Sequence, residues 1–158
     1  YHYSIKELEE FPNPQDAIYK RGAPETFNAL SLQRDLDRIV NGNESVVQLP
    51  GFDHAKGDPE PNLHVFDRSE HQVVICEGLY LLHDEHGFQD IFRFFDRTIF
   101  VNANVDVCIE RLKVRNKAIP GYTPQEIDIR CEVVDKANAM IVVRSKDRAD
   151  MVVESRAI

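Results

Sequence analysis

The chain has 158 residues, of which 42% are hydrophobic and 29% are charged, and its formal net charge is −8. This length and composition suit one globular domain, and no apolar run approaches the roughly 18 residues that a membrane-spanning helix needs. The acidic balance argues against a nucleic-acid partner, which needs a broad basic face. It allows a small phosphorylated ligand held by a few arginines.

Three cysteines, Cys76, Cys108 and Cys131, are scattered along the chain among apolar residues. Their odd number and wide spacing are typical of reduced thiols, not of a disulfide framework or a zinc finger. The opening residues lack the basic and apolar regions of a signal peptide. We therefore expect a cytoplasmic protein that does not contact a membrane.

The first part of the chain alternates short helical patterns with irregular stretches. Helices are predicted at residues 5–11, 14–20 and 30–42. In the third, four apolar side chains share one helical face and a glycine follows as a natural stop. These residues are Leu32, Leu36, Ile39, Val40 and Gly42. Strands are expected at residues 45–50 and 63–67, on either side of a proline- and glycine-rich loop or hairpin at 50–61.

The segment QVVICEG, residues 72–78, has the strongest strand pattern of the chain. It is short, rich in β-branched residues and not alternating, as in parallel strands buried on both faces. Further strands are expected at residues 98–103 and 150–155, and helices at 87–95, 106–118 and 123–142. The last helix opens with a capping box, Thr123 to Glu126. This alternation predicts an α/β fold, a parallel sheet flanked by helices.

Glu77 stands at the carboxyl end of the predicted strand 72–78, directly before Gly78. In open α/β sheets, ligands bind beyond the carboxyl ends of the strands. A carboxylate there suits holding Mg²⁺ beside the phosphates of a nucleotide. The alternative is that Glu77 only caps a following helix, and the strand pattern does not separate the two.

Arg111 and Arg115 are four residues apart on a predicted helix, so they share one face. Arg130 follows on the next helix, after an irregular segment that contains proline and glycine. Such an arrangement suits a lid that closes over phosphates, because guanidinium groups pair with phosphate oxygens in a bidentate way. The alternative is solvated salt bridges with the nearby Glu110, Glu126 and Asp128.

Five fragments of the chain together resemble the phosphoribulokinase/uridine kinase/pantothenate kinase superfamily of P-loop kinases, in its nucleoside or sugar kinase-like group. They are KRGAPETFN (20–28), PGFDHAKGDP (50–59), VVICEGLYLL (73–82), CIERLKVRN (108–116) and EIDIRCEVVDKANAMIV (126–142). The resemblance covers nearly the whole chain. It implies a P-loop NTPase-type parallel sheet and transfer of the γ-phosphate of ATP, with Mg²⁺, to a hydroxyl group of a small metabolite.

On the nucleotide side, the resemblance assigns five residues by position. Glu77 resembles the Walker B-like carboxylate near Mg²⁺, and Arg111 and Arg115 resemble lid arginines on the transferring phosphate. Arg130 matches a later arginine of the lid helix. Asn138 matches an asparagine near the adenine or one that holds the helix in place, and for this mid-helix residue packing is an open alternative.

On the substrate side, the resemblance assigns Glu25 and the loop residues Phe52, Asp53 and His54. Glu25 matches an acidic residue that holds substrate hydroxyls in nucleoside kinases, although it could also cap the turn after Pro24. Asp53 could instead form an Asx turn, and His54 could make a structural hydrogen bond.

The chain departs from the family at one central feature, because it contains no G-x-x-x-x-G-K-[ST] phosphate loop. Tyr1 and His2 resemble the tail of an Asp-Gly-aromatic-His segment, cut just after its aspartate. We therefore expect residues 1–158 to be the C-terminal part of a single kinase domain that lacks its central strand here. Residues 1–70 would form the substrate region, and residues 71–158 the Walker B-like strand, the lid and the last strand.

Such a part alone is expected to be inactive, since phosphoryl transfer depends on the positioning and charge that the phosphate loop supplies. The competing hypothesis is a non-catalytic nucleotide-binding or regulatory domain that keeps the kinase scaffold. A third hypothesis is a nucleotide hydrolase without an acceptor substrate.

Overall fold

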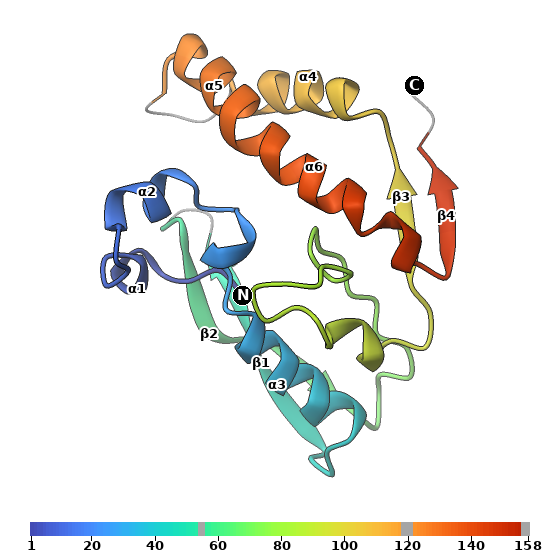
Figure 1. Cartoon of the computed structure of the whole chain (residues 1–158). Helices are drawn as coiled ribbons and strands as arrows, with labels where there is room; N and C mark the ends of the chain where they lie inside the picture. The colour runs from blue at the N-terminus through green and yellow to red at the C-terminus, as the bar shows by residue number, and fades with distance from the viewer. Residues whose placement is uncertain (54–55, 118–121, 156–158) are drawn as a thin grey trace. The chain divides into compact units, whose positions relative to one another are not determined.

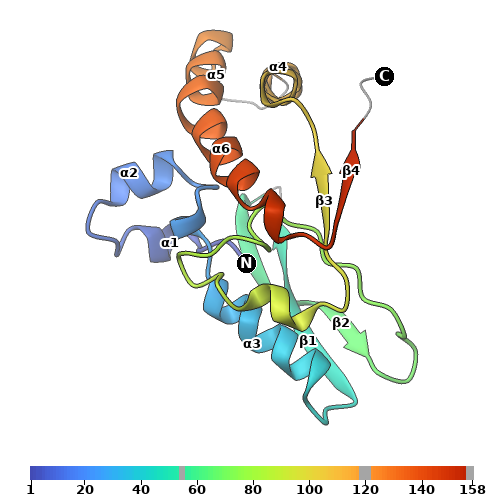
Figure 2. The same cartoon turned by 45° about the vertical axis from the view of Figure 1, so that its right-hand side comes forward.

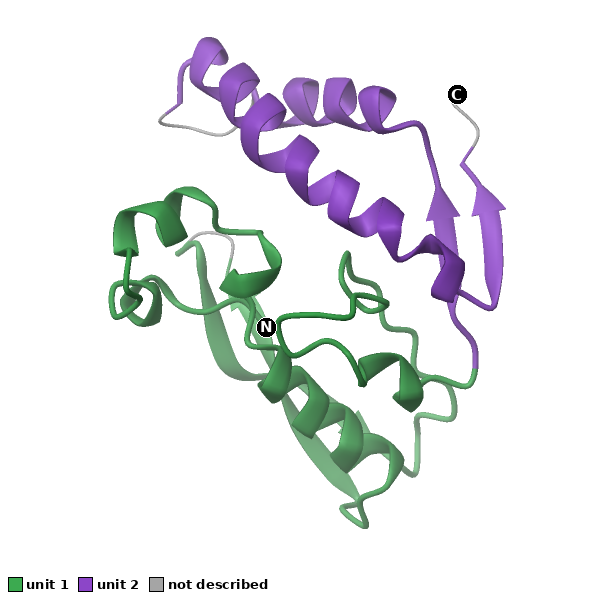
Figure 3. Cartoon of the chain, in the orientation of Figure 1, with its two compact units in different colours: residues 1–96 green, residues 97–158 purple. Residues whose placement is uncertain are grey.

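The computed structural model describes residues 1–53, 56–117 and 122–155. The chain forms two compact units, Tyr1–Asp96 and Arg97–Ile158 (Figure 3). Within these described residues, each unit holds one two-stranded sheet, β1 with β2 in the first and β3 with β4 in the second. Among the described residues, no helix has both the length and the apolarity to cross a membrane.

The first unit begins with short helical elements that have polar side-chain caps. Ser4 forms a capping box with Glu7, and Asn28 accepts a hydrogen bond from the backbone N–H of Ser31. The predictions of helix at residues 5–11 and 14–20 are confirmed, with shorter bounds. The elements are α1 (Ile5–Leu8), α2 (Pro14–Tyr19), a 3-10 helix (Pro24–Thr26) and α3 (Ala29–Val40).

Helix α3 lies along a β-hairpin, as Figures 1 and 2 show. The hairpin pairs β1 (Val46–Asp53) with β2 (Asp58–Asp67) in antiparallel register, so the expectation of two strands around a turn is confirmed. Ile39 on α3 packs with Val47 and Phe66 of the hairpin, and all three are buried. The helical face predicted from the sequence is therefore the face that meets the sheet, except that Val40 stays half exposed.

The prediction of a buried strand at residues 72–78 is wrong for this structure. Residues 73–78 carry no regular secondary structure, and Val73 and Ile75 are 78% and 90% exposed. A strand needs neighbours that pair with its N–H and C=O groups, and none of the described residues pairs with this segment. The helix predicted at residues 87–95 shortens to the 3-10 turn Ile91–Phe94, in which Ile91 is buried.

The second unit pairs β3 (Ile99–Asn102) with β4 (Met151–Glu154) in parallel. The pair is closed at one end by Asp150, whose carboxylate accepts hydrogen bonds from the Thr98 backbone N–H and hydroxyl at 2.7 and 2.8 Å. At the other end Asn102 donates two bonds of 2.9 Å to Glu154. Both predicted strands and the parallel arrangement are confirmed, and with the flanking helices they make the fold α/β.

The helices of the second unit are α4 and a long composite helix, and the two cross at an angle (Figures 1 and 2). Ile109 of α4 packs against Ile127 and Cys131 of the composite helix. The capping box of Thr123 and Glu126 is present, as the sequence predicts. The elements are α4 (Val105–Asn116), α5 (Pro124–Arg130), a π-helical turn (Cys131–Asp135), α6 (Lys136–Arg144) and a 3-10 helix (Lys146–Arg148).

Candidate functional site

Glu77 lies at the end of the extended segment 73–78 and is exposed. The residues after Gly78 form turns, and the next helical residues are Ile91–Phe94, so Glu77 does not cap a helix. Its carboxylate makes no hydrogen bond or ion pair with another described residue. An exposed, unneutralised carboxylate offers the oxygen ligands that Mg²⁺ binds, so the residue present fits the predicted metal role.

Two segments that carry predicted substrate residues of the first unit meet at the imidazole of His2. The ring of His2 lies 4.1 Å from that of Phe27 and 5.3 Å from that of Phe52, measured between centroids. Phe27 follows the 3-10 helix that carries Glu25, and Phe52 belongs to β1 beside Asp53. The segments with Glu25 and with Phe52 and Asp53 are thus brought to the same place by His2.

Glu25 is exposed on the 3-10 helix Pro24–Thr26, which has no side-chain cap. Glu25 therefore does not cap this turn, which was the alternative role considered for it. Asp53, by contrast, accepts a hydrogen bond of 3.3 Å from the Lys56 backbone N–H and pairs with the Lys56 ammonium at 3.1 Å. It stabilises the turn between the hairpin strands, which is the structural role weighed for it. His54 lies outside the described residues.

Arg21 anchors this part of the first unit. Its guanidinium donates hydrogen bonds to the carbonyl oxygens of Tyr3 and Gly57, at 2.7 and 2.5 Å, and to the Asp58 carboxylate at 2.7 Å. It also lies over the Phe52 ring, 5.5 Å from the centroid. Because one side chain joins the opening segment to the start of β2, Arg21 fixes the surroundings of His2. The sequence analysis did not single out Arg21, although it stands within the fragment 20–28 that carries the resemblance, and it named His2 only as the tail of an Asp-Gly-aromatic-His segment.

His2 is neutral at physiological pH. Burial lowers the pKa of its imidazole from 6.5 to about 4, with smaller effects from the positive charges of the Tyr1 amino group and of Arg21. A neutral imidazole offers both a donor and an acceptor nitrogen. The ring next to Phe27 and Phe52 is therefore suited to contact an uncharged polar ligand.

Arg111 and Arg115 lie on one exposed face of α4, as their spacing predicts. They line a shallow depression of about 600 Å³, the other lining residues being Asp106, Val107, Glu110 and Val114. Neither arginine makes an ion pair within the described part of the chain. Of the acidic neighbours weighed as partners, Glu110 pairs with Lys113 at 2.7 Å and Glu126 closes the capping box of α5.

Lys113 and not an arginine neutralises the acidic groups between α4 and the composite helix. Its ammonium lies 2.7 Å from Glu110 and 2.6 Å from Glu132, and these two contacts raise the Lys113 pKa. Lys136 pairs with Asp106 at 2.9 Å on the same interface. The lysines thus leave the guanidinium groups of Arg111 and Arg115 available to an anion.

Arg130 ends α5 directly before the π-helical turn, which is closed by a bond from the Lys136 N–H to the Cys131 carbonyl. Such turns are rare and often mark functional segments. Asn138 is 8% exposed on α6. Its burial favours the packing role weighed for it. The structure places Arg130 and Asn138 in the same unit as Arg111 and Arg115, and Glu25, Phe52, Asp53 and Glu77 in the other.

The sequence analysis missed one further group of polar side chains, His83, Glu85 and His86. Its signal is visible in the sequence as His-Asp-Glu-His, residues 83–86.

Comparison with known proteins relates this geometry to a family. Escherichia coli YggC, an uncharacterized protein, is 33% identical over 135 residues, which are 85% of this chain and 54% of YggC. The ATP-dependent kinase YFH7 of Lachancea thermotolerans is 32% identical over 150 residues, 73% of this chain and 43% of YFH7. The chain thus spans about half the length of these two relatives.

A solved structure from Silicibacter sp. TM1040, provisionally named a fructose transport system kinase, has the same fold. Its TM-score is 0.83 at 27% sequence identity, and the match covers 97% of this chain and 70% of that one. The expected P-loop kinase fold is therefore confirmed. Residues 6–157 also match the family model, and the chain accordingly belongs to the phosphoribulokinase/uridine kinase family.

Proposed function

We propose that the protein is an ATP- and Mg²⁺-dependent kinase that transfers the γ-phosphate of ATP to a hydroxyl group of a small metabolite. The observation that carries this proposal is the pair Arg111 and Arg115, which share one exposed face of α4 without an ion-pair partner in the described chain. Phosphoryl transfer spreads negative charge over the transferring group, and bidentate guanidinium groups stabilise that charge.

The other assigned residues have supporting roles in this proposal. Glu77 holds Mg²⁺ through its carboxylate, and the ion neutralises charge on the phosphates when bound. Arg130 approaches the phosphates from the start of the π-helical turn. Asn138 is buried and holds the lid helix in place.

The acceptor binds next to His2 in this proposal. Glu25 is exposed and accepts hydrogen bonds from substrate hydroxyls, while the rings of Phe27 and Phe52 supply apolar contact. A neutral His2 adds a hydrogen bond without adding charge. Nucleosides and sugars combine hydroxyls with an uncharged frame, whereas pantothenate offers hydroxyls beside a carboxylate.

The phosphate loop is absent from residues 1–158, and we place it in a part of the protein outside this sequence. That part also supplies the loop lysine, the Mg²⁺-binding hydroxyl and the general base. Residues 1–158 alone then have no kinase activity, because they do not bind the triphosphate through a phosphate loop and have no general base to remove the proton of the acceptor hydroxyl.

The test is a kinase assay on the complete gene product with Mg²⁺-ATP and a panel of nucleosides, sugars including fructose, and pantothenate. Arg111→Ala and Arg115→Ala are each expected to lower turnover by about tenfold or more. Arg144→Ala removes another exposed arginine of the same unit and serves as the control. Unchanged turnover in both lid variants would contradict the assignment.

A non-catalytic nucleotide-binding domain that keeps the kinase scaffold is the second candidate, since such a domain needs no phosphate loop. The two candidates differ in the complete gene product. A strand followed by a glycine-rich loop ending in Lys-Ser or Lys-Thr supports the kinase. ATP consumption without any phosphorylated acceptor supports a hydrolase instead.

A further inference from the structure

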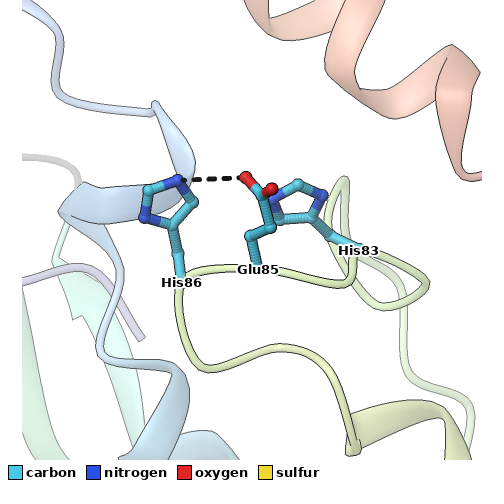
Figure 4. A group of neighbouring side chains, drawn as sticks. All are labelled: His83, Glu85 and His86. Carbon is cyan, nitrogen blue, oxygen red and sulfur yellow. Dashed lines mark ion pairs between the residues drawn. The ribbon is translucent and has the colours of Figure 1, made fainter.

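Two imidazoles and one carboxylate converge on a single turn of the first unit. His83, Glu85 and His86 each offer one ligand atom, and these atoms all lie within 4.8 Å of one another. Figure 4 shows the three side chains rising from the same side of the turn. Histidine nitrogens with a carboxylate oxygen are the ligand set of many protein sites for zinc and related transition metals.

The turn that carries these residues is held from both ends. The Tyr80 hydroxyl donates a 2.7 Å hydrogen bond to the Gly22 carbonyl, and the Phe88 backbone N–H donates one of 3.0 Å to the Glu85 carbonyl. Tyr80 and Phe88 are 2% and 3% exposed. Fixed anchors on either side reduce the conformational freedom that a metal ion must remove on binding.

His86 occupies the left-handed region, with φ of 55°, and the next residue, Gly87, has φ of 86°. A residue with a Cβ atom is uncommon there, and such conformations concentrate at functional sites. The reversal brings the His86 ring back beside His83, with 5.8 Å between centroids and 17° between planes. The left-handed conformation of His86 is therefore unfavourable in itself, and it places the His86 imidazole next to that of His83.

The carboxylates of the turn lie near the imidazoles. Glu85 Oε2 is 3.9 Å from His86 Nε2, and Asp84 Oδ1 is 3.7 Å from His83 Nδ1. Both distances exceed the hydrogen-bond range. A carboxylate at this distance favours a positive charge between the groups, and it can orient a metal-bound imidazole from behind.

We propose that His83, Glu85 and His86 bind one divalent transition-metal ion of the zinc class, with a position left open for water or another ligand. Tetrahedral ligands of zinc stand about 3.4 Å apart at normal bond lengths, so the three atoms must draw together by an ångström or so. Glu85 and His86 have 73% and 43% of their side chains exposed and can move, whereas His83, at 10%, is the fixed ligand.

This site differs from the proposed Mg²⁺ role of Glu77 in its chemistry. Mg²⁺ prefers oxygen ligands, and imidazole nitrogens select zinc, cobalt or nickel instead. The ion would rigidify residues 83–86, which lie between the buried residues Tyr80 and Phe88. The site requires no kinase activity.

The test measures metal binding directly on the purified, chelator-treated protein. Zn²⁺ titrated by calorimetry is expected to bind with a stoichiometry of one, and Co²⁺ is expected to give a ligand-field absorption spectrum without thiolate charge transfer. Glu85→Gln and His86→Ala change exposed side chains and are each expected to weaken Zn²⁺ binding by about tenfold or more. His64→Ala removes an exposed imidazole of β2 and serves as the matched control.

Zn²⁺ is also expected to raise the melting temperature of the wild type and of His64→Ala, but not that of His86→Ala. Affinity should fall toward acidic pH, because protons compete with the metal for imidazole nitrogens. The proposal is overturned if no Zn²⁺ binds, if the Co²⁺ spectrum shows cysteine ligation, or if both Glu85→Gln and His86→Ala bind Zn²⁺ as tightly as the wild type.

Discussion

At the scale of single residues, the packing of His2 leads to a measurable titration. Its imidazole lies between the rings of Phe27 and Phe52, and burial lowers its pKa to about 4. We expect an NMR titration to show a midpoint near this value for His2. A midpoint near 6.5 would mean that the ring is exposed to water and that the aromatic group does not form.

The lowered pKa of His2 also determines how the free energy of unfolding changes with pH. The unfolded chain takes up a proton near pH 6.5, whereas the folded chain resists it down to about pH 4. The contribution of neutral His2 to stability is therefore complete above pH 6.5 and is lost as the pH falls toward 4. His2→Gln should lose this component in urea unfolding measured across that range, while His64→Gln should keep it.

At the scale of elements, the start of α5 depends on a reciprocal cap. Thr123 accepts a bond from the Glu126 N–H at 3.3 Å, and Glu126 accepts one from the Thr123 N–H at 2.7 Å. Thr123→Ala is expected to reduce the free energy of unfolding by about 1 kcal/mol. Replacement of exposed Ser155, which caps no helix, by Ala is a control measured in the same urea titration.

The same cap has a pH dependence with a defined sign. Hydrogen bonds from Thr123 lower the Glu126 pKa below its ordinary 4.5. The carboxylate therefore stabilises α5 above about pH 4.5, and this stabilisation is lost as the pH falls through the lowered value. The difference in stability between the wild type and Glu126→Gln should shrink over that acidic range. A difference that stays constant there would contradict the reciprocal cap.

Elements whose signals are local were predictable from the sequence. The apolar face of α3 and the Thr123–Glu126 cap follow from helical periodicity and end chemistry, and both are present. The π-helical turn at Cys131–Asp135 was not predicted, because no local residue pattern distinguishes it from a regular helix. The strand at residues 72–78 was predicted wrongly, since a buried strand depends on its neighbours and not only on its own residues.

At the scale of the whole molecule, the sequence predicted which candidate site residues share one helix, but not which distant segments meet. The shared face of Arg111 and Arg115 follows from their spacing on α4. The ring contacts of His2 with Phe27 and Phe52 join segments that are far apart in the sequence, so no local sequence pattern predicts them. His83 and His86 were missed for another reason, because their short motif matches no regular helical metal site and depends on the left-handed backbone of His86.

The exposed segment 73–78 allows a whole-molecule test that rests on the proposed function. Ile75 is 90% exposed in this chain, so Ile75→Thr should change the unfolding free energy of residues 1–158 by less than about 0.5 kcal/mol. If a longer gene product supplies a strand beside this segment, Ile75 becomes buried there, and the same substitution should cost about 1.5–3 kcal/mol. Urea titrations of both polypeptides measure this, with Val65→Thr on the half-exposed face of β2 as the control. Equal, small effects in both polypeptides would show that no strand covers Ile75 in the longer gene product.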